Sequence, residues 1–276
     1  DSNYKINALV DTNINSAKSI IKKFGFFAEC MDDIDLLDEC DAAIVYVPPH
    51  LHAAMVLKLL EKGIHVLCEK PIATNLKDAL QMYNTAMHTR KTLLVGMTKH
   101  YCRNTELLKD ILESGMLGNI QSYKLSSGTR STWNAANPKR YDPRYTLGGV
   151  VFENGIHWIY RLLFWFGYPK LASYKDDRIG GVEANAFIEC AHTSAVGKIK
   201  GYMVFSSDHV LENKLTILGT KMKAEIFDSD EESVYISTLI NNKEKIMVIK
   251  DKQCQEPRNL FQAELNDFQK SIKTSI

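Results

Sequence analysis

The sequence lacks any long apolar run: no segment approaches the roughly 18–20 residues that a membrane-spanning helix needs. The most apolar stretch, WIYRLLFWFG, is too short and is interrupted by Arg161. An excess of charge of one sign is also lacking, since 34 lysines and arginines stand against 33 aspartates and glutamates. We therefore expect neither a membrane protein nor one that binds nucleic acid through a basic surface.

Cysteine pairs and clusters are absent as well. The six cysteines are scattered, with no CxxC pair and no Cys/His cluster that could form a metal site. This spacing is typical of reduced thiols in a cytoplasmic protein, and we expect no bound metal. Hydrophobic residues make up 45% of the 276 positions, enough for one or two globular domains with sizeable cores.

No GxGxxG motif occurs, although the first hundred residues otherwise have the pattern of a dinucleotide-binding fold. Strands are predicted over residues 5–11, 41–49, 65–70 and 91–97, and helices over 13–25, 50–63 and 75–90. Gly25 and Gly63 suit helix C-termini, and Asn75 or Thr74 can cap the third helix. The alternation predicts βαβ units in a parallel sheet buried on both faces.

The missing motif belongs to the first strand of such a fold. That strand is central in the doubly wound order, and the glycine loop after it binds the pyrophosphate. The sequence begins about where the second strand would begin. We therefore expect that about 20–30 residues, the length of a strand, a glycine loop and a helix, precede Asp1 in the natural protein. The dinucleotide-binding domain is expected over residues 1–99.

After about residue 100 the pattern becomes that of an α+β domain, expected over residues 100–276. Helices are predicted over 104–115, 150–167 and 259–272, with a loop over 129–147. A strand at 120–128 and six later alternating stretches predict a large, mainly antiparallel open sheet with one covered face. The fold class is therefore α/β: a Rossmann-type doubly wound parallel sheet followed by an α+β domain.

Several blocks of sequence carry a resemblance to a known family. They are DAAIVYVPPHLHAAMVLKLLEKGIHVLCEKPIATNLKDA, LLVGMTKHY, LLKDILESGMLGNIQSYKL and GGVVFENGIHW. With these blocks the sequence resembles the Gfo/Idh/MocA family, named for glucose–fructose oxidoreductase and inositol dehydrogenase, along essentially its whole length. The resemblance implies a Rossmann domain joined to an α+β domain whose sheet forms an oligomer interface.

The EKP block indicates one part of a catalytic site. An apolar run ends there in Glu69, Lys70 and Pro71, which without the resemblance would be read as an exposed charged turn. The resemblance implies that Lys70 points between the nicotinamide and the substrate and stabilises negative charge on the substrate oxygen. It also implies that Glu69 lies beside the nicotinamide ribose and that Pro71 fixes the direction of the chain.

The GxH block indicates the other part. The resemblance implies that His157 takes the proton of the substrate hydroxyl, a task suited to an imidazole with a pKa of about 6.5; a histidine packed beside Trp158 is the plain alternative. Glu153 and Tyr160 depart from the aspartates of the family pattern. Residues four apart share a helix face, so Glu153 can orient His157 or contact substrate, but its extra methylene can also impair the site.

Further residues are expected to bind the ligands. Asp11, at the end of the first predicted strand, is either a plain turn residue or the partner of the adenosine ribose, where it repels a 2′-phosphate and favours NAD over NADP. Pro48 and His52 match the family segment that passes along the cofactor. Lys99 follows the fourth strand, at the ligand-binding edge of such sheets. The loop residues Trp133, Arg140 and Tyr141 suit a sugar bearing a carboxylate or phosphate, or belong to a surface crossover.

These residues predict an NAD(P)-dependent oxidoreductase that transfers a hydride between nicotinamide and a hydroxyl or carbonyl carbon of a sugar, cyclitol or nucleotide-sugar. Two alternatives stay open: a family member without turnover that binds a ligand or partner, and a lyase or glycosidase that uses NAD for transient oxidation. We expect a small sugar-like substrate, and a homo-oligomer, a dimer or tetramer, formed through the C-terminal sheet.

Overall fold

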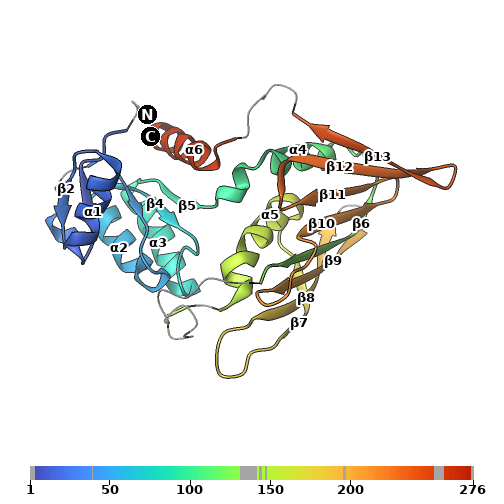
Figure 1. Ribbon diagram of the computed structural model, residues 1–276, viewed down its shortest axis with the longest axis horizontal. Coiled ribbons are helices and arrows are strands. Elements are labelled where there is room, and N and C mark those ends of the chain that lie inside the picture. Colours follow the sequence, from blue (N-terminus) through green and yellow to red (C-terminus); the bar gives the residue numbers. More distant parts are fainter. Residues whose placement is uncertain are drawn as a thin grey trace. The chain divides into compact units, whose positions relative to one another are not determined.

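A computed structural model divides the chain into two compact units, Asp1–Val95 with Ser271–Ile276, and Gly96–Lys270. The structure describes residues 4–274 except 39, 131–141, 143, 144, 147, 195, 196 and 252–257. Figure 1 shows the helices and strands of both units.

The first unit has two small sheets. In one, β1 (Ala8–Val10) pairs in parallel with β2 (Glu29–Met31). In the other, β4 (His65–Glu69) lies between β3 (Ala42–Val45) and β5 (Leu93–Gly96), and β3 and β4 are parallel. The described strands thus follow the predicted parallel pairing, but in two sheets where one was expected.

The position of β3 at a sheet edge corrects one prediction. The strand was expected to be buried on both faces, yet Ile44 is 60% exposed, because only β4 pairs with β3 in the described part of the chain. The sequence prediction also misses β2 and the 3-10 turn Ile34–Leu36. Each of these elements has three residues, too few to show a period.

Three helices connect these strands: α1 (Ile14–Phe24), α2 (Pro49–Glu61) and α3 (Leu76–Thr89). Their ends confirm the predicted caps. Gly25 ends α1 in the left-handed region with φ of 68°, where glycine has no steric penalty. The side chain of Asn75 accepts a hydrogen bond of 2.8 Å from the main-chain N–H of Asp78 at the start of α3.

The second unit is built on an eight-stranded sheet in the order β13-β12-β11-β10-β6-β9-β8-β7 (Figure 1). The strands are β6 (Ile120–Gly128), β7 (Lys170–Asp176), β8 (Asn185–Ser194), β9 (Gly197–Ser206), β10 (Lys214–Gly219), β11 (Lys223–Phe227), β12 (Asp230–Ile240) and β13 (Lys243–Lys250). All neighbours are antiparallel except β6 and β9. The prediction misses β7, because this edge strand exposes most of its side chains and has no apolar alternation.

Helices α4 (Arg103–Glu113) and α5 (Ile156–Phe166) lie on one face of this sheet (Figure 1). A π-helical turn, Val151–Gly155, precedes α5, so the single predicted α-helix begins in a different geometry. The 3-10 turn η2 (Thr98–Tyr101) precedes α4. The last helix of the described chain, α6, spans Leu260–Thr274.

The core of the second unit lies between the sheet and these helices. It is formed by side chains that alternate along the strands and by the inner faces of α4 and α5: Leu108, Tyr123, Leu125, Trp158, Leu162, Phe205, Leu215, Ile217, Ile226 and Ile236. Burying each such large apolar side chain contributes about 1.5–3 kcal/mol. The predicted one-sided sheet is therefore the frame that holds α5 in place.

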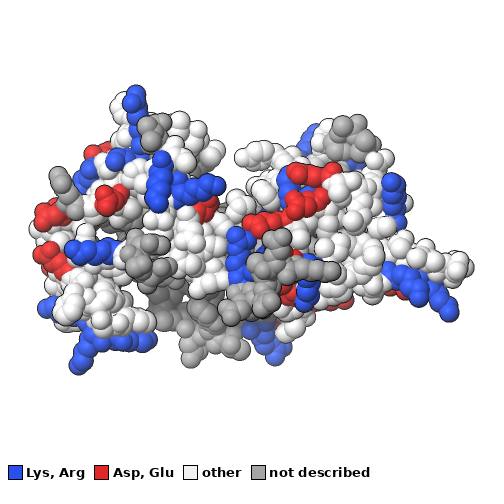
Figure 2. Space-filling model, turned by 90° about the horizontal axis from the view of Figure 1, so that it is seen from above, with Lys and Arg blue, Asp and Glu red and all other residues white. Residues whose placement is uncertain are grey.

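The surface carries charges of both signs. On the side shown in Figure 2, lysines and arginines are interspersed with aspartates and glutamates on both units. Within the residues described above, no helix is both long and apolar enough to cross a membrane. The same part of the chain contains no group of three or more His, Cys, Asp or Glu side chains placed to hold a metal ion.

Candidate functional site

The EKP segment stands at the carboxyl end of β4. Val66 and Cys68 are fully buried, whereas Glu69 and Lys70 are only partly buried. The carboxylate of Glu69 accepts a hydrogen bond of 3.1 Å from the main-chain N–H of Lys70, and the peptide bond between Lys70 and Pro71 is cis. A buried strand thus ends by bringing an acid and a lysine to the edge of the sheet.

His52 on α2 contacts the main chain of this segment. Its ring is 1% exposed, with Nδ1 2.8 Å from the main-chain oxygen of Pro71 and Nε2 2.8 Å from that of Val47. Both ring nitrogens therefore face main-chain carbonyl groups, and the nitrogen that carries the proton donates to one of them. His52 therefore helps to position the loops that follow β3 and β4, and its contact with a cofactor stays a prediction.

Cys68, next to this segment, is not a nucleophile. Burial, and to a smaller degree the charge of Glu69, raises the pKa of its thiol to about 12. A thiol with that pKa stays protonated near neutral pH, and only the thiolate attacks efficiently. The thiol of Cys68 is therefore not a candidate nucleophile at this end of β4.

Asp11 stands at the carboxyl end of β1. Its main-chain N–H donates to the oxygen of Met31 over 3.0 Å, which extends the pairing with β2 by one residue. Its carboxylate is exposed and accepts a hydrogen bond of 2.7 Å from the N–H of Asn13, the cap of α1. At the corresponding end of β3, Pro48 forms the N-terminal boundary of α2.

In the second unit, Glu153 lies in the π turn and His157 in the first turn of α5. Single π turns inside helices occur frequently at functional sites. Gly155, between them, packs against the ring of Phe205, where an added Cβ would lie 3.0 Å from a ring carbon. Phe205 is fully buried. The glycine of the GxH block thus brings the helix close to the sheet.

Polar contacts fix α5 to α4. The buried guanidinium of Arg161 lies 4.7 Å from the ring of Trp158 and 4.9 Å from that of Trp165, and it donates to Asn104 over 2.6 Å. The indole N–H of Trp165 donates to the main-chain oxygen of Thr105 over 3.1 Å. Burial lowers the pKa of Arg161 to about 10, so the side chain stays charged at neutral pH. The helix that carries His157 is therefore rigidly attached.

Lys99 lies in η2, directly after β5, as its place in the sequence predicts. Its ammonium lies 2.6 Å from Glu231 and 3.2 Å from Asp228, next to the turn between β11 and β12. Burial lowers the pKa of Lys99, but the bond to Glu231 and the charge of Asp228 outweigh burial and raise it above the usual value. The ammonium is therefore paired with two carboxylates, and a substrate contact of Lys99 stays a prediction.

Tyr160 points toward η2. Its hydroxyl lies 3.4 Å from Nδ1 of His100, and the two rings meet edge to face with centroids 5.5 Å apart. The ring of Phe164, one turn further along α5, meets His100 in the same way at 5.1 Å. The residue at position 160 therefore takes part in an aromatic cluster between α5 and η2.

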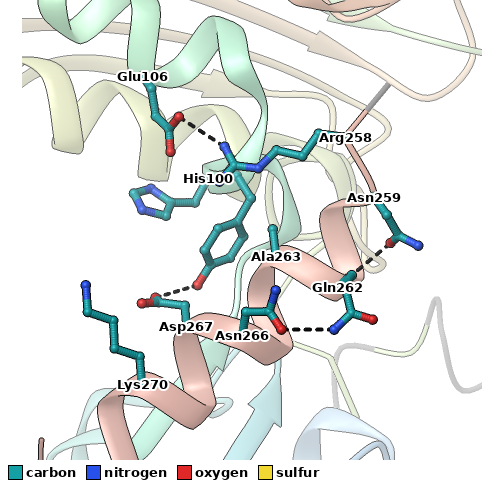
Figure 3. Close-up of a pocket in the computed structure, with 10 residues that line it drawn as sticks. His100, Glu106, Arg258, Asn259, Gln262, Ala263, Asn266, Asp267 and Lys270 are labelled. Atoms are coloured by element: carbon teal, nitrogen blue, oxygen red, sulfur yellow. Dashed lines mark hydrogen bonds and ion pairs between the residues drawn. The ribbon is translucent and has the colours of Figure 1, made fainter. Parts of the chain in front are cut away.

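A pocket of about 530 Å³ lies beside this cluster (Figure 3). Several of its side chains pair with one another: Arg258 lies 3.0 Å from Glu106, and the hydroxyl of Tyr101 donates to Asp267 over 2.8 Å. Its amides do the same, since Gln262 donates to Asn266 over 3.0 Å. Because these groups satisfy each other, we assign the pocket no ligand.

The remaining expected substrate residues, Trp133, Arg140 and Tyr141, lie outside the described residues. Of the expected residues, the first unit brings together Glu69, Lys70 and Pro71 through the chain itself and adds His52 through space. The sequence prediction overlooks Asn104, which bonds Arg161. No sequence pattern links these two positions, which are 57 residues apart.

Comparison with known proteins identifies the family. Residues 1–97 match the model of an oxidoreductase family with an NAD-binding Rossmann fold, and residues 105–225 match the GFO/IDH/MocA C-terminal domain. The chain belongs to the Gfo/Idh/MocA family. The resemblance seen in the EKP and GxH blocks is thereby confirmed.

Curated relatives of this Gfo/Idh/MocA chain include sugar dehydrogenases. It is 32% identical over 166 residues to glucose-6-phosphate 3-dehydrogenase of Bacillus subtilis (strain 168), an alignment that covers 57% of this chain and 45% of the relative. It is 27% identical over 172 residues to D-glucoside 3-dehydrogenase of Escherichia coli (strain K12), with 60% and 48% covered. The matched part of the chain spans about half the length of these relatives.

Solved structures of similar fold cover nearly all of the chain. Levoglucosan dehydrogenase in complex with NADH and levoglucosan aligns with a TM-score of 0.83 at 15% identity, covering 98% of this chain and 80% of that one. A 3-ketoreductase from Actinomadura kijaniata, in complex with NADP and TDP-benzene, aligns with a TM-score of 0.81 at 18% identity, covering 98% and 82%. The predicted fold class, a Rossmann-type sheet followed by a mainly antiparallel sheet, is confirmed.

Proposed function

We propose that the protein is an NAD-dependent dehydrogenase that oxidises a hydroxyl group of a sugar or cyclitol, or reduces the corresponding carbonyl. The observation that carries this proposal is the Glu69–Lys70–Pro71 segment at the end of β4, braced by His52, in a chain of the Gfo/Idh/MocA family. The names of the relatives favour the same chemistry, because they include dehydrogenases of glucose 6-phosphate, of D-glucosides and of myo-inositol.

The residues of the first unit fit a nicotinamide dinucleotide. The exposed carboxylate of Asp11 stands at the carboxyl end of a parallel strand, where an acid can accept hydrogen bonds from both ribose hydroxyls. Such a carboxylate repels a 2′-phosphate, so NAD is favoured over NADP. Pro48 and Glu69 stand at the carboxyl ends of β3 and β4, the edge at which such sheets bind ligands.

In this proposal each catalytic residue has one task. The bound cofactor supplies the hydride acceptor. The ammonium of Lys70 binds the substrate oxygen and stabilises the negative charge that develops on it. The imidazole of His157 accepts the proton of the same hydroxyl group, and Glu153, one turn earlier, orients that imidazole. Lys99, Trp133, Arg140 and Tyr141 remain proposed substrate contacts.

The test is reduction of NAD⁺, followed at the nicotinamide absorbance band, with a panel of glucose 6-phosphate, alkyl glucosides, myo-inositol and UDP-sugars. Turnover with one class of substrate, lost in His157→Asn, is the expected result. Binding of NAD⁺ without turnover of any substrate would favour a family member that only binds ligands. Cleavage of a glycoside without net reduction of NAD⁺ would favour the lyase or glycosidase alternative.

We also propose a division of labour along the chain, with residues 1–99 binding the cofactor and residues 100–276 binding substrate and forming a homo-oligomer. The outer face of the eight-stranded sheet exposes large apolar side chains, among them Val204, Leu218, Leu239, Ile246 and Val248. Exposed apolar residues gathered on one sheet face are typical of an interface.

Light scattering after size exclusion tests this oligomer. We expect a dimer or tetramer that dissociates in Val204→Glu, whereas Lys109→Glu on the opposite, helical side leaves the mass unchanged. A monomer in the unaltered protein at micromolar concentration would contradict the proposal.

A cytoplasmic location completes the proposal. All five cysteines in the described part of the chain, Cys30, Cys40, Cys68, Cys102 and Cys190, are free thiols. The reducing cytoplasm keeps thiols in this state. Fractionation of cells that express the protein, with detection by antibody, tests the location.

A further inference from the structure

A buried carboxylate lies at the start of the helical segment that carries Glu153 and His157. Glu183 is only 3% exposed and precedes β8 by two residues. Its carboxylate accepts a hydrogen bond of 3.3 Å from the main-chain N–H of Val151, the first residue of the π turn. Burying a carboxylate is unfavourable unless it is paired or hydrogen-bonded, so this location calls for a reason.

The main-chain groups at this helix start give that reason. The first N–H groups of a helix have no acceptor within the helix and carry partial positive charge. The N–H of Val150 donates over 3.0 Å to the main-chain oxygen of Glu183, and that of Val151 donates to its carboxylate. The next two N–H groups, of Phe152 and Glu153, both reach the oxygen of Gly149. Glu183 therefore serves two of the first four donors from a distant part of the sequence.

The glycines before the helix make this contact possible. A Cβ added to Gly149 would lie 1.8 Å from the main-chain oxygen of Glu183, a distance that no side chain can occupy. A Cβ added to Gly148 would lie 3.2 Å from both carboxylate oxygens. The two glycines at the start of GGVVFENGIH therefore let Glu183 pack directly against the main chain.

The segment around Glu183 is itself held in place. One carboxylate oxygen of Asp177, just beyond β7, accepts hydrogen bonds of 2.9 Å from the N–H groups of both Ala184 and Asn185. Its other oxygen accepts from the side chain of Asn185 over 2.7 Å. A chain of contacts therefore runs from Asp177 through Glu183 to the first turn of the helix.

We propose that Glu183 is a positioning residue that sets the start of the π turn, and through it the places of Glu153 and His157. This inference rests on the proposed function, because it deepens the role of that helix in proton transfer. Glu183 itself touches neither substrate nor cofactor. A shift of about 1 Å in a group that transfers a proton can lower the rate about 100-fold, so the loss of this cap is expected to lower kcat.

Two measurements test the proposal in Glu183→Ala, Glu183→Gln and Gly149→Ala. Hydrogen exchange followed by mass spectrometry reports the segment 148–158 without any substrate. We expect exchange there to rise about tenfold or more in Glu183→Ala and Gly149→Ala, with β10 and β11 unchanged. Glutamine keeps an acceptor for Val151 and is expected to restore protection. The exposed Glu113→Ala, which removes only an ion pair with Lys109, is the matched control.

Steady-state kinetics with NAD⁺ and whichever sugar of the panel is turned over form the second measurement. We expect kcat to fall about tenfold or more in Glu183→Ala, with the KM for NAD⁺ unchanged, and to recover in Glu183→Gln. Unchanged exchange at 148–158 in both Glu183→Ala and Gly149→Ala would overturn the proposal. Increased exchange with normal kcat, while His157→Asn is inactive, would overturn the positioning role alone. Full activity of His157→Asn would instead overturn the proposed function, and the exchange data would still report whether Glu183 holds the helix.

Discussion

The Nδ1 atom of His52 lies 2.8 Å from the main-chain oxygen of Pro71, the residue after the proposed catalytic Lys70. The Nε2 atom of the same ring lies 2.8 Å from the oxygen of Val47. One buried ring therefore ties together the loops that follow β3 and β4. We infer that the position of Lys70 depends on a residue 18 places earlier in the chain.

The substitutions His52→Asn and His52→Gln separate the contact of His52 with Pro71 from its contact with Val47. Asparagine keeps a donor near the place of Nδ1, and glutamine keeps one near the place of Nε2. A neutral imidazole has one N–H and donates to one of the two carbonyl groups, so the variant that removes this donor is expected to lose about 1–3 kcal/mol in urea unfolding and the other variant less. His52→Gln loses the contact to Pro71, and we expect its kcat to fall about tenfold below that of His52→Asn. Equal kcat values in the two variants would contradict a link between His52 and Lys70.

Lys70 and His157 are expected to act on one substrate oxygen. Removing a group that stabilises developing charge typically lowers kcat about 100- to 1,000-fold, and we expect a loss of that size in Lys70→Met. Residues that act as a unit have strongly non-additive effects. The double variant Lys70→Met, His157→Asn should therefore be little slower than the slower single variant. Additive losses in steady-state assays would indicate that the two residues act in separate steps.

Asp11 is expected to set the cofactor preference. Its carboxylate can bind the ribose hydroxyls of NAD and repels the 2′-phosphate of NADP. In Asp11→Asn, fluorescence titration should show NADH bound about tenfold more weakly, a loss of about 1.4 kcal/mol, and NADPH bound at least as well as before. Asp41→Asn, at the start of β3, is a control that should leave both affinities unchanged. Tighter binding of NADPH than NADH by the unaltered protein would reject the assignment.

Arg161 is expected to be important for stability. Its guanidinium is buried between two indole rings, and removing the side chain leaves a cavity and takes the donor away from Oδ1 of Asn104. Truncation of such a buried, bonded charge costs about 3–5 kcal/mol, the loss expected in Arg161→Ala from urea unfolding. Arg161→Met fills the space between the rings and should lose less. Arg161→Lys should not match the unaltered protein, because an ammonium lacks the planar group that stacks on both rings.

His100 is expected to make the protein less stable in mild acid. Burial lowers its pKa, and the opposing charges of Asp267 and Glu106 do not compensate. The unfolded chain therefore binds this proton more readily, so the free energy of unfolding falls as pH drops below about 6.5 and is constant above it. Urea midpoints between pH 7.0 and 5.5 should fall, and less steeply in His100→Gln. The exposed His88→Gln should leave the slope unchanged; an equal slope in all three proteins would contradict the prediction.

The predictions differ in what they require. Those for Arg161 and His100 need only unfolding measurements, whereas those for His52, Lys70 and Asp11 depend on the proposed dehydrogenase activity or its cofactor. A protein that unfolds as expected but turns over no sugar would leave the fold interpretation intact and remove the catalytic one.

The sequence by itself determined the order of the main elements and several of their ends. Helices at 13–25, 50–63 and 75–90 and the strand at 120–128 were predictable, because apolar periodicity and caps such as Gly25 and Asn75 act over a few neighbouring residues. The EKP block was also recognisable, since a strand, its end and the next residues are contiguous. The family followed from these local blocks.

Only the tertiary structure decided which distant residues serve the site. His52 meets Pro71 across 19 positions, Arg161 meets Asn104 across 57, and Glu183 meets Val151 across 32. None of these pairs can be recognised from a periodic pattern in the sequence, because each depends on how whole elements pack. The ammonium of Lys99 shows the same limit, because its ion pair with Glu231 joins residues that are far apart in the sequence. Secondary structure depends on patterns among neighbouring residues, whereas the partners of a buried polar group depend on how the whole fold packs around it.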